Sequence, residues 1–141
     1  MTLATILTAA LLSQQTHCLA TTVYREARGE SYSGQVAVAL VVRNRVLSDK
    51  FPDTPCQVMV QPRQFAFVSH DLHLADPMDG VAWETDLRAS QDVLAMPIHA
   101  YERPMQNSLY FHSGNKPLWD FTKLEEVVTI GEHTFYRDKD K

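Results

Sequence analysis

Apolar residues recur at helical spacing from near the start of the chain. Within residues 1–17 the spacing i, i+3, i+4, i+7 and i+8 predicts a leading amphipathic helix, carried by Leu3, Ile6, Leu7, Ala10 and Leu11. A cleaved signal peptide is the alternative, but the stretch lacks a cationic beginning and a convincing small-x-small cleavage site. It is also too short to span a bilayer, so no stable membrane insertion is expected.

The next helical stretch carries a carboxylate on its apolar stripe. Leu19, Val23, Glu26 and Ala27 share one face, and Gly29 provides a natural helix end. Burial and the negative end of the helix dipole both raise the pKa of a glutamate at this place. A general acid that works near neutral pH needs a shift in this direction. Glu26 is therefore a candidate catalyst, and an ion pair at a helix end is the alternative.

Two arginines flank Glu26 in the stretch "VYREARGE". Arg25 and Arg28 would lower the pKa of Glu26 if they reached its carboxylate, but we expect them to bind the last carbonyls of the helix. Glu30 lies beyond Gly29, where it is expected to be solvated or to cap the start of the next helix. The two glutamates are thus expected to have unlike environments and roles.

The remaining pattern predicts two further helices and a small β element. The run "SYSGQVAVALVVRNRV", capped by Ser31 or Ser33, predicts a buried helix, although its valines would also suit a strand. Residues 50–80 contain four prolines and predict an irregular loop of the kind that lines a cleft. A third helix, capped by Asp79, is predicted to turn four side chains inward: Trp83, Leu87, Val93 and Leu94.

The C-terminal third favours β structure. "SLYFHS" predicts a short strand, and "VVTIGEHTFY" predicts a hairpin with a type II′-like turn at Gly131 and Glu132. With no repeat or linker in the sequence, we expect residues 1–141 to form a single domain of the α+β class that is mainly α-helical.

Composition narrows the classes of function. A net charge of −4 and an isoelectric point near 5.8 argue against a nucleic-acid partner. Cys18 and Cys56 allow either one disulfide or two buried thiols, and they cannot hold zinc without histidine or carboxylate ligands.

Several blocks in order resemble one known family. They are Y-x-E-A-R-G-E at 24–30, G-Q-x-A-V-A and N-R-V within 34–46, F-P-x-T-x-C at 51–56, Q-F at 64–65, an aromatic-His strand at 110–112 and "IGEHTFY" at 130–136. Over residues 18–136 the sequence resembles the SleB-type cell wall hydrolases, which include spore-cortex lytic enzymes. The resemblance implies a lysozyme-like, mainly helical catalytic domain that acts on peptidoglycan glycan strands.

The resemblance also implies a mechanism. Similar members are lytic transglycosylases whose acid is the first glutamate of E-A-R-G-E, which is Glu26 here. Its carboxyl group would protonate the oxygen between N-acetylmuramic acid and N-acetylglucosamine, then remove the proton of the 6-hydroxyl as a 1,6-anhydro ring closes. Muramidase-type hydrolysis would need a second carboxylate. The candidates by residue type are Glu30, Asp71, Asp76 and Asp79.

Other residues are candidates for binding the glycan. Gln64 matches the glutamine of the family's Q-F block, while Phe67 replaces the usual tryptophan as a stacking surface and Ala66 loses a hydroxyl. For the remaining candidates a purely structural role is equally open. They are Tyr110, His112, Tyr136 (whose hydroxyl could point to Glu26) and Trp119, with Glu30 as a secondary candidate.

Two rival functions remain open at this stage. A peptidase acting on peptidoglycan stems could use zinc held by His70, His73 and His112, or a Cys18–His112 pair, but neither spacing matches a known helical motif. A binding module with a dead site would have no need of an acid at position 26. Within the resemblance, Cys56 is the expected disulfide partner of Cys18.

The expected partner is therefore the peptidoglycan strand, with no cofactor and no metal. Action is expected at the bacterial cell wall, in the periplasm, outside the cell or by phage delivery. The sequence does not specify the export route or the oligomeric state.

Overall fold

The computed structural model describes residues 2–61, 80–97, 105 and 107–139. Within these ranges, four α-helices are followed by three strands in chain order. They are α1 (Leu3–Ala27), α2 (Tyr32–Val46), α3 (Pro55–Met59), α4 (Gly80–Ala95), β1 (Tyr110–Ser113), β2 (Leu124–Ile130) and β3 (His133–Asp138), with a short 3₁₀ turn at Phe121–Lys123 before β2. The expected α+β class, mainly α-helical with a small sheet near the C-terminus, is confirmed.

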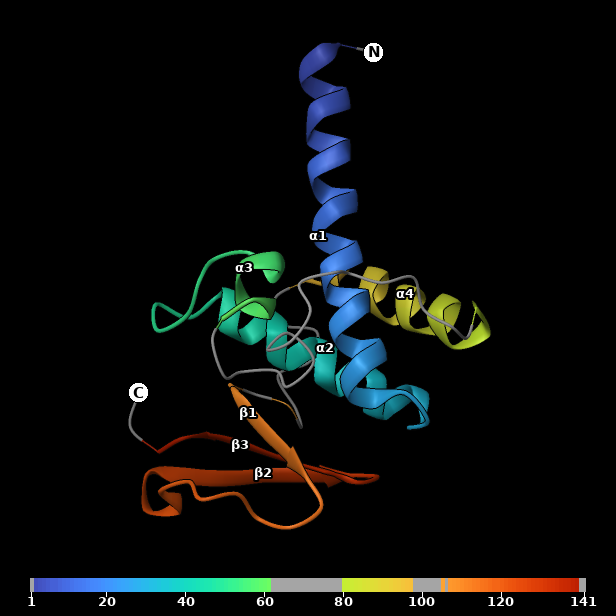
Figure 1. Cartoon of the computed structure of the whole chain (residues 1–141). Coiled ribbons are helices and arrows are strands. Elements are labelled where there is room, and N and C mark those ends of the chain that lie inside the picture. Colours follow the sequence, from blue (N-terminus) through green and yellow to red (C-terminus); the bar gives the residue numbers. More distant parts are fainter. Residues whose placement is uncertain (1, 62–79, 98–104, 106, 140–141) are drawn as a thin grey trace.

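The helix α2 forms the centre of the core. Nearly every residue from Gly34 to Arg45 is buried, and Ser31 caps the helix by accepting a hydrogen bond from the backbone of Gly34. This apolar run is helical rather than extended because helix α1, helix α4 and the sheet surround it and bury side chains on all its faces. Figure 1 shows α2 between α1 and α4 on one side and the sheet on the other.

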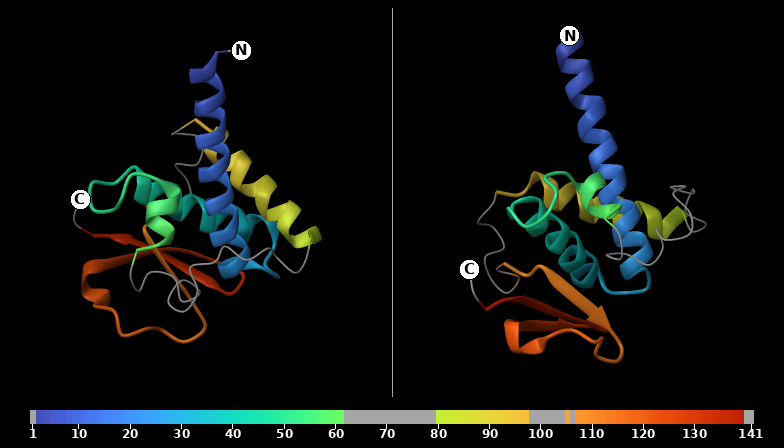
Figure 2. Two further views of the ribbon diagram at one scale, coloured as in Figure 1. Left: turned by 45° about the horizontal axis from the view of Figure 1, so that its top comes forward. Right: turned by 60° about the vertical axis from the view of Figure 1, so that its left-hand side comes forward.

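The leading stretch and the stripe that carries Glu26 belong to one long helix. α1 runs from Leu3 to Ala27, and its first half extends away from the rest of the domain in both further views (Figure 2). Leu3 and Leu11 are exposed by 72% and 60%, so the prediction that this first stripe packs inward is wrong for these two residues. The domain core begins only at Cys18, where α4 and α2 come to lie against the helix.

The face that α4 turns inward differs in part from the prediction. Val93 is fully buried, but Leu94 is 39% exposed. Its place in the core is taken by a stripe at helical spacing: Asp86, Ala89, Ser90 and Val93. Leu94 is rotated by about 100° from Val93 around the helix, which places it beyond the edge of this stripe. The predicted cap, Asp79, lies outside the described residues.

The three strands form an antiparallel sheet in the order β1-β3-β2. β2 and β3 are joined by the predicted turn, in which Gly131 has a φ of +58°, as the first central position of a type II′ turn requires. A register shift between Glu126 and Val128 marks a β-bulge in β2. Phe135 of β3 is fully buried and joins the sheet to the helical core.

The polar residues at the end of α2 tie the core to β1. Asn44 donates hydrogen bonds to the carbonyls of Met105 and Ser108, and Arg45 donates one to the carbonyl of Leu109 at 2.8 Å. Arg43 donates to the carbonyl of Val93 in the last turn of α4 and to that of Pro97 just beyond the helix. The N-R-V block thus fixes where the chain enters β1, since these side chains satisfy carbonyls outside regular structure.

A disulfide between Cys18 and Cys56 joins α1 to α3. Beside it, the side chain of Gln15 accepts a hydrogen bond from the backbone of Cys56 at 3.0 Å. The bond closes a loop with a sequence separation of 38 residues that contains all of α2. It therefore restricts the unfolded chain between two elements of the core.

Reduction of this disulfide is expected to lower the free energy of unfolding by about 2–4 kcal/mol, the range for a loop of this size. Urea denaturation of the oxidised and reduced protein, with the Cys18→Ser/Cys56→Ser double variant alongside, measures the loss. Equal stability of all three samples would contradict a contribution of the bond to the fold.

Candidate active site

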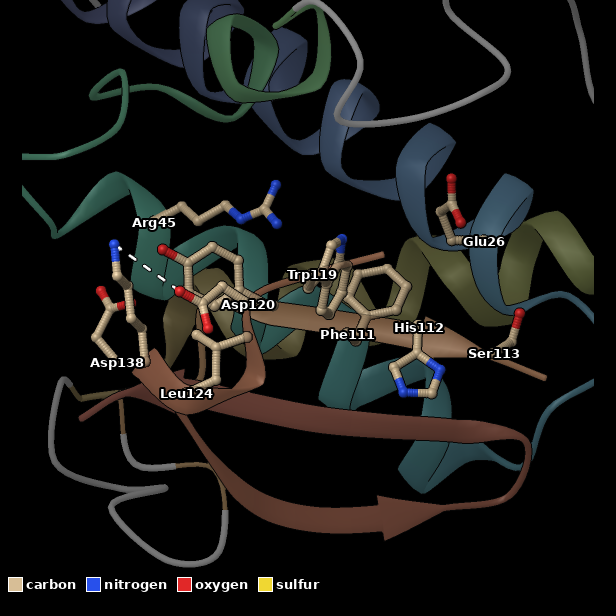
Figure 3. A pocket seen from close by; sticks show the side chains of 11 residues that line it. Glu26, Arg45, Phe111, His112, Ser113, Trp119, Asp120, Leu124 and Asp138 are labelled. Carbon is tan, nitrogen blue, oxygen red and sulfur yellow. Dashed lines mark ion pairs between the residues drawn. The ribbon is translucent and has the colours of Figure 1, made fainter. Parts of the chain in front are cut away.

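Glu26 lies in the last turn of α1 and faces a cavity between the helices and the sheet. The cavity has a volume of about 490 Å³ and Glu26 is half-buried at its wall. In Figure 3, Glu26 comes from the helical side, while His112 comes from β1. The cavity is lined by Glu26, Arg45, Tyr110, Phe111, His112, Ser113, Trp119, Asp120, Lys123, Leu124 and Asp138.

Two opposing effects act on the Glu26 carboxyl group. Partial removal from water is the larger effect and raises its pKa, as the sequence predicted. The positive charge of Arg45 acts in the opposite direction. The net result is a carboxyl group that holds its proton to a higher pH than an ordinary glutamate.

Arg45 is the cation that the sequence did not identify. It is almost fully buried, and its burial lowers its own pKa to about 10. Its guanidinium lies 4.9 Å from the ring centre of Phe51 and 6.0 Å from that of Tyr110. The sequence indicates its role only through the place of a charged residue at the end of a largely apolar helix. Arginine side chains are rarely buried unless they have a partner.

Arg25 and Arg28 do not act as predicted. The guanidinium of Arg28 donates a hydrogen bond to the hydroxyl of Tyr24 at 2.7 Å and lies 5.0 Å from the centre of its ring. Arg25 lies 5.8 Å from the same ring. Both cations are therefore directed back along α1 to an aromatic side chain instead of to the last helix carbonyls, and the cation that acts on Glu26 is Arg45.

Aromatic rings make up much of the cavity wall. Trp119 is half-buried and lies 6.3 Å from Tyr110 and 5.7 Å from His112, measured between ring centres. Tyr110 and His112 are two apart on β1 and therefore lie on one face of the sheet. Aromatic faces of this kind suit the apolar faces of sugar rings.

The hydroxyl of Tyr136 does not point to Glu26. It forms a hydrogen bond with Nε2 of His112 at 2.9 Å, and the two rings stack at 5.4 Å between centres. The side chain is buried and does not line the cavity. The prediction is wrong because Tyr136 pairs with Tyr110 on the neighbouring strand. This pairing directs the Tyr136 ring toward His112 and Trp119. Its role is to support His112.

Both aspartates that line the cavity, Asp120 and Asp138, are bound to neighbouring side chains. Asp138 pairs with Lys50 at 2.7 Å and forms a hydrogen bond with Tyr110. Asp120 accepts hydrogen bonds from the backbone and hydroxyl of Thr122, which hold its pKa below the usual range. Each side chain is therefore already bound to neighbouring groups.

Glu30 is neither solvated nor a helix cap. Its side chain, 14% exposed, accepts a hydrogen bond from the backbone of Glu132 at 3.0 Å, and Ser31 caps α2 instead. Glu30 turns toward the β2–β3 turn because Gly29, with a φ of +90°, reverses the chain after α1.

Some predicted residues cannot be placed. Gln64, Phe67, His70 and His73 lie outside the described residues, as do Asp71, Asp76 and Asp79. Within the described ranges, no group of three or more His, Cys, Asp or Glu side chains could hold a metal ion. Because the sulfur of Cys18 is bonded to Cys56, the Cys18–His112 pair is ruled out. Among the described residues, no helix has the length and apolar character to cross a membrane.

Comparisons with known proteins agree with this geometry. The model of the family described as Cell Wall Hydrolase matches residues 29–136. The spore cortex-lytic enzyme of Oceanobacillus iheyensis is 35% identical over 119 residues, which cover 83% of this chain and 39% of that protein. The spore cortex-lytic enzyme of Bacillus cereus is 34% identical, with 83% and 42% covered. The chain thus spans about two fifths of the length of these relatives.

Solved structures give the same result for the fold. The catalytic domain of the germination-specific lytic transglycosylase SleB from Bacillus anthracis superposes with a TM-score of 0.68 at 31% identity, covering 86% of this chain and 92% of that one. The catalytic domain of the Bacillus cereus SleB protein gives a TM-score of 0.66 at 30% identity. Sequence and fold agree over most of the chain, which belongs to the Cell Wall Hydrolase family.

Proposed function

We propose that this chain is a peptidoglycan lytic transglycosylase that cleaves the bond between N-acetylmuramic acid and N-acetylglucosamine, with Glu26 as its acid and base. The observation that carries the proposal is the half-buried Glu26 carboxyl group with a raised pKa at the wall of an aromatic-lined cavity. The similarity to the catalytic domain of SleB from Bacillus anthracis, a germination-specific lytic transglycosylase, supports the same reaction. The site of action would then be the cell wall, outside the cytoplasm.

Glu26 first acts as an acid. Burial favours the protonated form of its carboxyl group, which donates this proton to the glycosidic oxygen as the bond to the muramic acid C1 breaks. The N-acetylglucosamine side leaves as an alcohol, and positive charge develops on the muramic acid ring. Glu26 is then a carboxylate, and the nearby charge of Arg45 stabilises it.

The same carboxylate then completes the reaction. It removes the proton from the 6-hydroxyl of the muramic acid, whose oxygen bonds to C1 and closes the 1,6-anhydro ring. Glu26 is protonated again at the end, so the cycle needs one carboxyl group and no water. The opposing effects of burial and Arg45 suit a group that has to donate and accept a proton in turn.

The engaged aspartates favour this route over hydrolysis. A muramidase needs a second carboxylate to activate water or to attack the sugar. Among the described cavity residues, Asp120 and Asp138 already pair with other groups, and Glu30 is directed to the β2–β3 turn. The described part of the site therefore offers one carboxyl group suited to acid catalysis.

Tyr110, His112 and Trp119 would bind the glycan, with Trp119 as a stacking surface beside the reacting bond. Tyr136 would act indirectly by holding His112 through the bond between its hydroxyl and the imidazole. Gln64 and Phe67 stay proposals from the sequence for the same task.

Glu26→Gln is expected to abolish cleavage, with a loss of at least about 100-fold, because an amide cannot donate the proton. Purified peptidoglycan is digested with each protein, and the products are analysed by mass spectrometry. The wild type should give 1,6-anhydromuramyl ends. Reducing muramic ends would indicate a muramidase, binding without cleavage would indicate a module with a dead site, and an active Glu26→Gln variant would refute the role of Glu26.

The same variant should also change how stability depends on pH. The pKa of Glu26 is higher in the folded than in the unfolded protein, so the wild type loses stability as pH rises from the ordinary glutamate value through the folded value. Glu26→Gln lacks this loss and should be the more stable protein at pH 7, by about 1.4 kcal/mol for each pH unit of the shift. Urea denaturation at pH 4 and pH 7 measures the free energy of unfolding of the wild type and of the variant. A wild-type advantage that grows toward pH 7 would mean that the pKa of Glu26 is lowered.

A further inference from the structure

The C-terminal end of α1 is attached to the β2–β3 turn by two side chains. Glu30 follows α1, and its carboxylate crosses to the turn, where the backbone N–H of Glu132 donates to Oε1 at 3.0 Å. Nδ1 of His133 lies 3.4 Å from the same oxygen. These contacts join residues about one hundred positions apart, so they fix how the helix lies against the sheet.

The turn is shaped to receive the carboxylate. Gly131 has a φ of +58°, a conformation that L-residues with side chains rarely adopt. A Cβ atom at this position would lie 2.3 Å from Oε2 of Glu30, which is closer than two such atoms can approach. The turn therefore favours glycine, and a larger residue here would also displace the Glu30 carboxylate from its place.

His133 connects Glu30 to the residue that we propose as the acid. Its ring is 3% exposed and lies edge-on to Phe111, with 5.2 Å between ring centres. Burial lowers the pKa of His133, whereas the charge of Glu30 and a hydrogen bond to the backbone of Glu26 act in the opposite direction. The ring thus lies between the Glu30 carboxylate and the last turn of α1, to which Glu26 belongs.

Glu30 is also tied to that turn of α1 through its own backbone, because its N–H donates a hydrogen bond to the carbonyl of Ala27 at 3.0 Å. Its carboxylate in turn binds the β2–β3 turn and lies 3.4 Å from Nδ1 of His133, the first residue of β3. The end of α1 is thereby held against the sheet, while the Glu26 side chain faces the cavity.

We propose that Glu30 and His133 form a positioning pair that sets the place of the Glu26 carboxyl group above the cavity. This inference rests on the proposed function. The pair does not touch the reacting bond and acts only through the backbone of Glu26. A displacement of about 1 Å can cost on the order of 100-fold in rate, so loosening the pair should slow the chemical step more than it weakens glycan binding.

Three variants test the pair against soluble glycan fragments, with kcat and KM measured separately. Glu30→Ala removes the acceptor for the turn and should lower kcat by about 10- to 100-fold with KM within about twofold. Glu30→Gln keeps an oxygen for the Glu132 N–H and an amide for His133, so it should restore kcat to within about threefold of wild type. Glu125→Ala, the control, removes the exposed pair of Glu125 with Arg137 and should leave both constants unchanged.

Rates are compared below the melting temperature of each variant, so that a loss of folded protein is not counted as a loss of catalysis. Should Glu30→Ala not fold, Glu30→Asp takes its place, because it keeps the charge but shortens the reach by one methylene. The inference is overturned if the variant matches Glu125→Ala in kcat, if its loss lies only in KM, or if Glu30→Gln is impaired equally.

Glu26→Gln, assayed in parallel, separates the two proposals. If Glu26→Gln is inactive while Glu30→Ala behaves like wild type, only the positioning pair is refuted. If Glu26→Gln keeps its activity, the proposed acid is wrong, and the positioning inference that rests on it is refuted as well.

Discussion

The contact between the end of α1 and the β2–β3 hairpin determines most of what the site can do. It holds the last turn of α1, which carries Glu26, against the sheet. The carboxyl group is partly removed from water at the wall of a cavity that β1, Arg45, Trp119 and the outer ends of the hairpin also line. Glu30, Gly131 and His133 maintain the contact, and each occupies a place that few other residues could fill.

The helices and the sheet contribute different things to the site. The central helix α2 and its neighbours α1 and α4 form a close-packed core, which fixes where α1 ends. The three-stranded sheet contributes the fully buried Phe135 to that core, and a wall of polar and aromatic side chains on the cavity side. Arg45 connects the two parts. It lies at the end of α2, donates a hydrogen bond to the carbonyl of Leu109 just before β1, and its positive charge acts on Glu26.

Features set by nearby residues could be predicted from the sequence. The end of α1 before Gly29, the cap at Ser31, the hairpin turn at Gly131 and the unusual place of Glu26 all follow from local spacing and turn chemistry. The raised pKa of Glu26 also follows, since a carboxylate on an apolar stripe has to lose water when that stripe packs.

Features that depend on distant contacts could not be predicted. Nothing local distinguishes Arg45 from Arg25 and Arg28 as the cation near Glu26, because the choice depends on how α2 crosses the sheet. Glu30 was expected in solvent because its partner is far away in the chain, at the β2–β3 turn. Leu3 and Leu11 have the spacing of a buried stripe, but no part of the described domain reaches that end of α1.

The most direct test of the account is the titration of the Glu26 carboxyl group itself. Carboxyl-labelled glutamate, assigned by comparison with Glu26→Gln, allows its carbon resonance to be followed by NMR as the pH is raised. The account predicts a midpoint above that of an ordinary glutamate, about 4.3. A midpoint at or below that value would show a solvated or ion-paired carboxylate, and would contradict a half-buried acid at the end of α1.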